Sequence, residues 1–210
     1  SNYRNSFLSF KNKEYDYVLG EAVLQTENGA DILDVNAGLP EIDEKEVLVK
    51  LVQEIQGVSN LPLQIDSTDK DANEAAVRVY NGKPIINSVN GKEESMSEIF
   101  PIVKKYGTLV VALTLDESGI PDTAEGRVEI AEKIIKKAKE YGIPEENILV
   151  DTLVLTASTN QETALENLKA IKIIKQKYNV KTVLGVSNVS FGLPNREAVN
   201  SVFLAMALEA

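Results

Sequence analysis

The chain has 210 residues, 43% hydrophobic and 26% charged, an ordinary globular composition that can bury about 70% of the unfolded surface. Its formal net charge of −10 argues against a nucleic-acid partner, because that affinity comes mainly from Lys and Arg side chains that neutralise phosphates. It contains neither Cys nor His, which excludes disulfides, thiolate nucleophiles, Ser-His triads and the usual zinc ligands.

Helices and short apolar runs alternate along the chain. Residues 1–14 show no clean period and are predicted to be an irregular segment or an expression remnant, followed by one domain over residues 15–210. Apolar runs rich in Val, Ile and Leu are typical of parallel strands covered on both faces, and amphipathic stretches that end at Gly or Asn predict helices. Helices are expected over 15–28, 43–56, 71–80, 93–106 (interrupted near Pro101), 123–141 and 161–178, and from Arg196 onward. Strands are expected to begin near residues 31, 61, 84, 108, 148 and 181.

This alternation, without a Gly-x-Gly-x-x-Gly turn, favours an α/β TIM (β/α)8-type barrel over a dinucleotide-binding sheet. A closed barrel has eight strands and six are visible, so we expect a barrel that lacks its first and last strands in this chain. Those two strands would be neighbours, and the edges beside the gap would invite pairing with another chain, for example in a homodimer. No apolar run reaches the ~20 residues of a membrane helix and no signal peptide is visible, so we expect a cytoplasmic protein with no membrane partner.

Polar residues stand at the carboxyl ends of the expected strands, where parallel β/α folds hold their ligands. Each of them has a structural alternative, because Asp, Asn and Ser after a strand often cap the next helix or form an Asx turn. We keep that alternative for Asp116. For Asp66 and Asp151 we expect other residues to cap the helices, namely Asp43, Asp71 and Asn160. The strand-end residues are Asp34, Asn36, Asp66, Asn87, Asp116, Asp151, Asn188 and Ser190.

Carboxylates and amides without a nearby Lys or Arg suit a neutral ligand that is rich in N–H donors. A pterin or a purine ring fits this description, whereas a phosphate does not. No Lys stands inside an expected strand, which argues against Schiff-base chemistry, and no set of metal ligands is visible.

Five stretches together resemble a known family: GADILDVNAG, PLQIDST, PIINSVNG, ILVDTLV and LGVSNVSFGLPNR. They are similar to the pterin-binding methyltransferase domain shared by cobalamin-dependent methionine synthase and methyltetrahydrofolate:corrinoid methyltransferases. The resemblance runs from about residue 15 to the end of the chain. It implies an enzyme that binds 5-methyltetrahydrofolate and passes the N5 methyl group to cob(I)alamin on a corrinoid-binding partner domain or protein.

The resemblance also implies individual roles. Asp66, Asn87 and Asp151 match the positions that hold the pterin, and Asn188 matches a mobile amide that reaches N5 and is the expected catalytic residue. Three further residues match motif positions near the ligand, namely Asn36, Ser190 and Arg196, with Arg196 toward the folate tail.

Two alternatives stay open at the level of the sequence. The family's N-terminal Glu-Arg-x-Asn-Pro-Thr-Gly-like strand and its final strand are not visible, so a barrel fragment without ligand or activity is one alternative. The other is an enzyme like dihydropteroate synthase, which has the same fold and also binds a pterin. Its Lys-containing loop and terminal Arg motif are not visible in this sequence.

Overall fold

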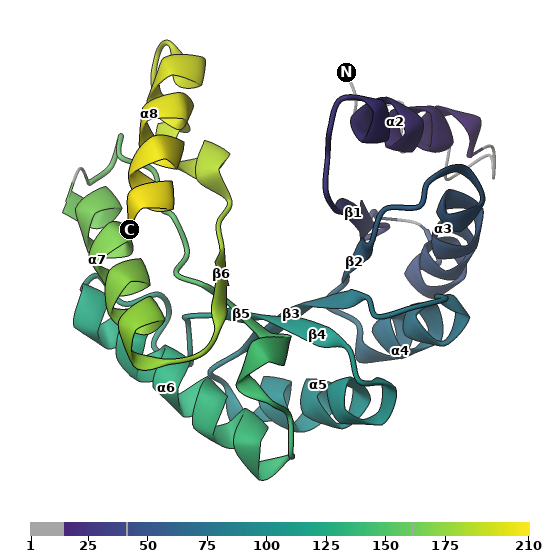
Figure 1. Ribbon diagram of the computed structural model, residues 1–210, viewed down its shortest axis with the longest axis horizontal. Helices are drawn as coiled ribbons and strands as arrows, with labels where there is room; N and C mark the ends of the chain where they lie inside the picture. The colour runs from purple at the N-terminus through teal and green to yellow at the C-terminus, as the bar shows by residue number, and fades with distance from the viewer. Residues whose placement is uncertain (1–14, 41, 161) are drawn as a thin grey trace. The chain divides into compact units, whose positions relative to one another are not determined.

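The computed structural model describes residues 15–40, 42–160 and 162–210, and the predicted irregular segment 1–14 lies outside these described residues. Helices and parallel strands alternate as predicted, and the strands follow one another in chain order (Figure 1). The strands are β1 Leu33–Asn36, β2 Leu63–Asp66, β3 Ile85–Asn90, β4 Leu109–Leu113, β5 Ile148–Asp151 and β6 Lys181–Val183. The α-helices are α2 Asp16–Glu27, α3 Glu44–Val58, α4 Lys70–Val79, α5 Glu93–Tyr106, α6 Ala124–Glu140, α7 Glu162–Lys177 and α8 Arg196–Glu209. Two 3-10 helices, η1 Glu145–Asn147 and η2 Val186–Ser190, precede β5 and follow β6.

The chain forms two compact units. Unit 1 takes the described residues up to Ser88 together with Lys105–Leu109, and unit 2 takes Val89–Lys104 and Val110–Ala210. In unit 1, β1 pairs in parallel with β2, and β2 with β3. Helices α3 and α4 pack side by side and cover these strands (Figure 1). The period of two along β1 buries Leu33 and Val35 and leaves the polar residues between them exposed.

In unit 2, β4 pairs in parallel with β5, and β5 with β6. Helices α6 and α7 lie side by side, and α8 packs against η2 (Figure 1). Val154, Val189 and Phe203 form a buried cluster that joins the segment after β5, η2 and α8. The core of this unit therefore fixes the segments that follow the carboxyl ends of β5 and β6.

Four predictions about the extent of individual elements are wrong. Strand β3, expected to end at Asn87, continues to Asn90. Helix α5 continues through Pro101, although proline removes one helical hydrogen bond, because its neighbours Ile99, Phe100 and Ile102 are buried and hold the helix in place. Helix α3 passes Gly57 and ends at Val58. The strand expected from Lys181 to Asn188 ends at Val183, because the chain then turns into η2.

In the described part of the chain, no helix combines the length and the apolar character that crossing a bilayer requires.

Candidate functional site

The last residues of β1 and β2, together with Asn87 inside β3, place the predicted residues of unit 1 in one row. The parallel register sets Asn36 beside Asp66, and Asp66 beside Asn87. The carboxamide of Asn36 donates a hydrogen bond from Nδ2 to Asp66 Oδ2 at 2.8 Å. The structure therefore brings Asn36, Asp66 and Asn87 together, three residues that are 30 and 21 positions apart along the chain.

A second row lies two residues earlier on the same strands. Gln64 Nε2 donates to Asp34 Oδ1 at 2.6 Å. The side chain of Asp34 is open to solvent on one side, but the groups around its carboxyl partly desolvate it and raise its pKa. The negative charge of Asp66 raises this pKa further, and hydrogen bonds from Gln64 and Asn87 lower it. Asn87 thus connects the two rows. Two carboxylates held side by side by amides form a surface that accepts hydrogen bonds from a ligand's N–H groups.

Gln64 belongs to this second row and was not among the predicted site residues. Its signal was present, because the period of two along β2 puts Gln64 and Asp66 on one face of the strand. Among the described residues, no group of three carboxylates gathers in a way that would hold a metal ion.

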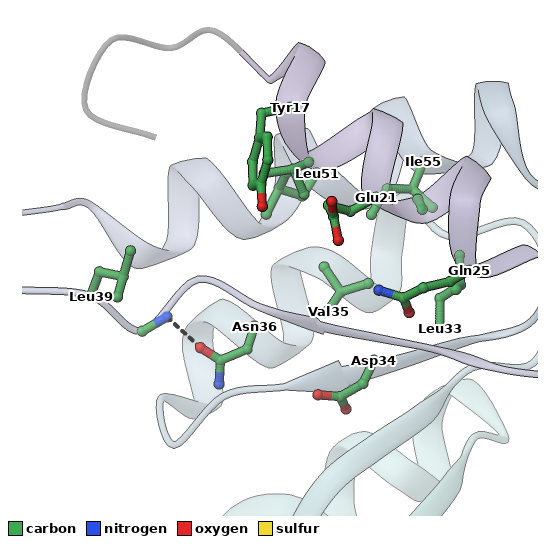
Figure 2. A pocket seen from close by; sticks show the side chains of 13 residues that line it. Tyr17, Glu21, Gln25, Leu33, Asp34, Val35, Asn36, Leu39, Leu51 and Ile55 are labelled. Atoms are coloured by element: carbon green, nitrogen blue, oxygen red, sulfur yellow. Dashed lines mark hydrogen bonds between the residues drawn. The ribbon is translucent and has the colours of Figure 1, made fainter. Parts of the chain in front are cut away.

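A cavity of about 390 Å³ opens between α2 and β1 in unit 1. Figure 2 shows Tyr17, Glu21 and Gln25 of α2 on one side of it, and Asp34 and Asn36 of β1 on the other. Asn36 Oδ1 accepts a hydrogen bond from Gly38 N at 2.9 Å, the dashed line in the figure. Asn36 is therefore held from both sides, by the Gly38 amide and by Asp66.

Asp151, in unit 2, ends β5. Its carbonyl oxygen accepts from Thr114 N at 3.0 Å and from Thr114 Oγ1 at 3.1 Å, which ties its backbone to the end of β4. Its carboxylate Oδ1 accepts from Leu153 N at 2.7 Å. Desolvation raises the pKa of Asp151 to about 6, opposed by the Leu153 N–H and by the positive charge of Arg127. At pH 7 the carboxylate is therefore still mostly ionised.

The remaining predicted residues lie on η2 and at the start of α8, not at a strand end. Asn188 is exposed, and its backbone is held by bonds to Gly185 and Phe191. Ser190 is fully buried and accepts from Arg196 Nε at 3.0 Å. Arg196 also donates from Nη2 to the carbonyl and hydroxyl oxygens of Ser187 at 3.0 and 2.7 Å. The structure therefore joins Ser190 and Arg196 into one contact.

Three other acidic residues were predicted to form an Asx turn or a helix cap, namely Asp116, Asp43 and Asp71. Asp116 forms the predicted Asx turn, since its Oδ1 accepts from Ser118 N at 2.8 Å. Asp43 caps α3 through Glu46 N, as predicted. Asp71 does not cap α4, because that cap is Asp69, whose extended backbone lets its carboxylate reach the first amides of the helix.

Parallel strands alternating with helices, with a row of acid and amide side chains on neighbouring strands, define the class: a barrel-type α/β protein with a polar candidate site. Solved structures agree on the fold. Dihydropteroate synthase from Stenotrophomonas maltophilia, with imidazole bound at its active site, has a TM-score of 0.72 at 18% identity, over 94% of this chain and 79% of that chain. Dihydropteroate synthase from Xanthomonas albilineans in complex with 7,8-dihydropteroate has a TM-score of 0.71 at 18% identity, over 91% and 74%. The predicted barrel-type fold is confirmed.

The family model described as pterin binding enzyme matches residues 4–210, and the chain belongs to that family. Methionine synthase from Mycobacterium tuberculosis is 36% identical over 211 residues, which are 94% of this chain and 18% of that protein. A methylcorrinoid:tetrahydrofolate methyltransferase from Eubacterium limosum is 31% identical over 204 residues, 95% of this chain and 75% of that protein. The chain thus spans less than a fifth of the methionine synthase and three quarters of the methyltransferase. The resemblance found in the sequence is confirmed.

Proposed function

We propose that the chain binds 5-methyltetrahydrofolate and transfers its N5 methyl group to a cob(I)alamin or other corrinoid carried by a partner domain or protein. Membership of the pterin binding enzymes supports the ligand class. Similarity to a methionine synthase and to a methylcorrinoid:tetrahydrofolate methyltransferase supports the reaction. The observation that carries the proposal is the row of Asn36, Asp66 and Asn87 on neighbouring strands, in which Asn36 is hydrogen-bonded to Asp66.

Recognition of the ligand follows from the donors of the pterin ring. The ring presents N–H and amino groups, and carboxylates are the strongest side-chain acceptors for them. In this proposal Asp66 and Asp151 accept from the ring, and Asn87 offers both a donor and an acceptor. Asn36 orients the Asp66 carboxylate through its 2.8 Å bond. Arg196, supported by Ser190, provides a cation for the carboxylate tail of the folate.

Methyl transfer breaks the bond between N5 and its methyl carbon, and the bonding electrons stay on nitrogen. A tertiary amine is a poor leaving group, so the step needs a proton or a hydrogen bond at N5 as negative charge develops there. In the proposal Asn188 supplies that hydrogen bond from an exposed carboxamide, and it stabilises the transition state more than the ground state. A corrinoid supplies the nucleophile when the partner is bound, so no side-chain nucleophile is required.

The composition of the chain is consistent with a partner that carries the corrinoid. A corrinoid held by an imidazole ligand, or a thiol substrate activated on thiolate-bound zinc, needs His or Cys, and this chain has neither. Those modules would have to lie on other segments or proteins.

Calorimetric titration of 5-methyltetrahydrofolate into the protein tests the proposal. We expect saturable binding, weakened about 5- to 150-fold by Asp151→Asn, the range of 1–3 kcal/mol for a lost charged hydrogen bond. Asp116→Asn is the matched control, because Asp116, like Asp151, accepts a bond from the backbone N–H two residues further on, but has no role in the proposed site. Methyl transfer is then followed by the spectral change of added cob(I)alamin.

A folded protein that shows no binding at millimolar folate would refute the proposal and favour a barrel without ligand. Condensation of a pterin diphosphate with 4-aminobenzoate, without methyl transfer to cob(I)alamin, would favour the dihydropteroate synthase alternative instead.

A further inference from the structure

Arg127 is the largest fully buried side chain of the described residues, and it lies on α6 next to the segment that follows β5. Its guanidinium donates from Nε to Pro121 O at 2.9 Å and from Nη1 to Thr152 O at 3.0 Å. Burying a charged group is costly unless hydrogen bonds and opposite charges compensate. A guanidinium kept in the core, bonded to two carbonyl groups of the chain, therefore calls for an explanation.

The carbonyl group that Arg127 Nη1 contacts belongs to Thr152, the residue directly after Asp151. The next residue, Leu153, has a φ of 57°, in the left-handed region that non-glycine residues seldom adopt. The Leu153 N–H donates to Asp151 Oδ1 at 2.7 Å and closes the turn over residues 151–153. Such a backbone costs of order 1 kcal/mol and persists only when its surroundings hold it. Arg127 holds it from one side, and Thr114 holds the Asp151 carbonyl from the other.

Arg127 also acts on Asp151 through its charge. Its positive charge lowers the pKa of Asp151, opposing the desolvation that raises it. Glu166 and Asp122 in turn favour the charged form of Arg127, and Glu166 is itself bonded to Ala124 N at 2.8 Å and to Lys169 at 2.6 Å.

The strands on either side of Asp151 add no charge at its level. On β4 the residue in register with Asp151 is Leu113, and on β6 it is Val183. The cation of β6, Lys181, is in register with Leu149, at the other end of that strand. Within the described part of the chain, Arg127 is the cation whose charge acts on this carboxylate.

We propose that Arg127 is a positioning residue for the pterin site: by gripping the Thr152 carbonyl it holds the 151–153 turn and presents the Asp151 carboxylate to the ligand, without touching the ligand itself. The inference rests on the proposed function, because it takes Asp151 as a ligand-binding group. It assigns a role to a side chain that is 24 positions away from Asp151 along the chain.

The test compares Arg127→Met, which removes the charge and both bonds, with Arg127→Lys, which keeps the charge. Lys136→Met is the matched control, because Lys136 lies on the same helix in an exposed ion pair with Glu132. The pH titration of the Asp151 side-chain carboxyl is followed by ¹³C NMR in the ligand-free protein, with Asp151→Asn identifying the signal. Folate affinity is measured in parallel between pH 5.5 and 8.5, roughly the range over which this carboxyl ionises.

We expect the pKa of Asp151 to rise in Arg127→Met, to rise less in Arg127→Lys, and to stay at about 6 in the control. A higher pKa leaves fewer Asp151 carboxylates ionised at pH 7. We therefore expect folate affinity at pH 7 to fall at least about twofold for each unit by which the pKa of Asp151 rises. This loss of affinity becomes smaller at higher pH, where the carboxyl is ionised again. A merely structural role would lower the affinity equally at every pH.

An unchanged Asp151 titration in either folded Arg127 variant would overturn the inference, whatever happens to binding. Should Arg127→Met fail to fold, the Arg127→Lys titration decides alone. The proposed function fails separately, because wild-type protein without folate affinity would refute it while the ligand-free titration still measures the coupling between Arg127 and Asp151.

Discussion

Asp151→Asn should stabilise the folded protein at neutral pH while it weakens folate binding. The side chain keeps its size, and only the ionisable carboxyl is lost. In the folded protein the pKa of Asp151 is about 6, against an ordinary value of 3.8, chiefly because burial disfavours the charged form. The folded state therefore binds this proton more tightly than the unfolded chain does. This difference in proton binding contributes to the free energy of unfolding. The contribution is complete below pH 3.8 and is lost as the pH rises through 6.

The magnitude follows from the two pKa values. Each tenfold change in proton affinity corresponds to about 1.4 kcal/mol, so the ionised carboxylate costs the fold at most about 3 kcal/mol at pH 7. Partial exposure of the side chain reduces this value. We expect Asp151→Asn to raise the free energy of unfolding by about 1–3 kcal/mol at pH 7 and by less than about 0.5 kcal/mol at pH 4.

Urea unfolding of wild type, Asp151→Asn and the control Asp116→Asn at several values between pH 4 and 7 measures the difference. Comparing variants at each pH removes the effect of all other titrating groups, which the three proteins share. An Asp151→Asn protein with wild-type stability throughout this range, or one that is less stable at pH 7, would refute the claim that burial of this carboxylate strains the fold.

Two further predictions concern side chains that each form a hydrogen bond in the structure, Asn36 and Thr123. Asn36→Ala removes the 2.8 Å bond to Asp66, and we expect calorimetry to show folate affinity reduced by about 0.5–1.5 kcal/mol, the usual net value of one hydrogen bond; unaltered affinity would remove Asn36 from the site. Thr123→Ala removes the cap of α6, where Thr123 Oγ1 accepts from Gly126 N at 3.2 Å. Thermal or urea unfolding should show a loss of about 1 kcal/mol with unchanged folate affinity, and a loss of affinity instead would link this cap to the site.

The alternation of elements could be predicted from the sequence because it depends on local patterns. The apolar runs place the starts of all six strands within a few residues of where they lie. The period of two puts Asn36 and Asp66 at strand ends, and parallel strands bring such ends to one edge. Three of the predicted site residues in unit 1 therefore lie together because the register follows from the pattern.

Arg127 shows what local patterns leave undecided. The helical period places it on the same face as Ala131 and Ile134, so a charge on an apolar face was visible. The role of Arg127 could not be predicted, because the Thr152 carbonyl group that it contacts lies in the segment after β5. The cap of α4 was missed for a smaller reason of the same kind, since Asp69 and Asp71 are equally good caps and only the backbone conformation chooses between them.

The sequence by itself determined the class of elements, their order, the ends of β1, β2 and β5, and the family, because these depend on periodicity and on motifs that are contiguous in the chain. Only the tertiary structure decided that Asn36 is bonded to Asp66, that Ser190 supports Arg196, and that Arg127 holds the turn after Asp151. The physical reason is that hydrogen bonds and desolvation depend on which groups meet in space, and this follows from packing between elements that no single stretch of the chain encodes.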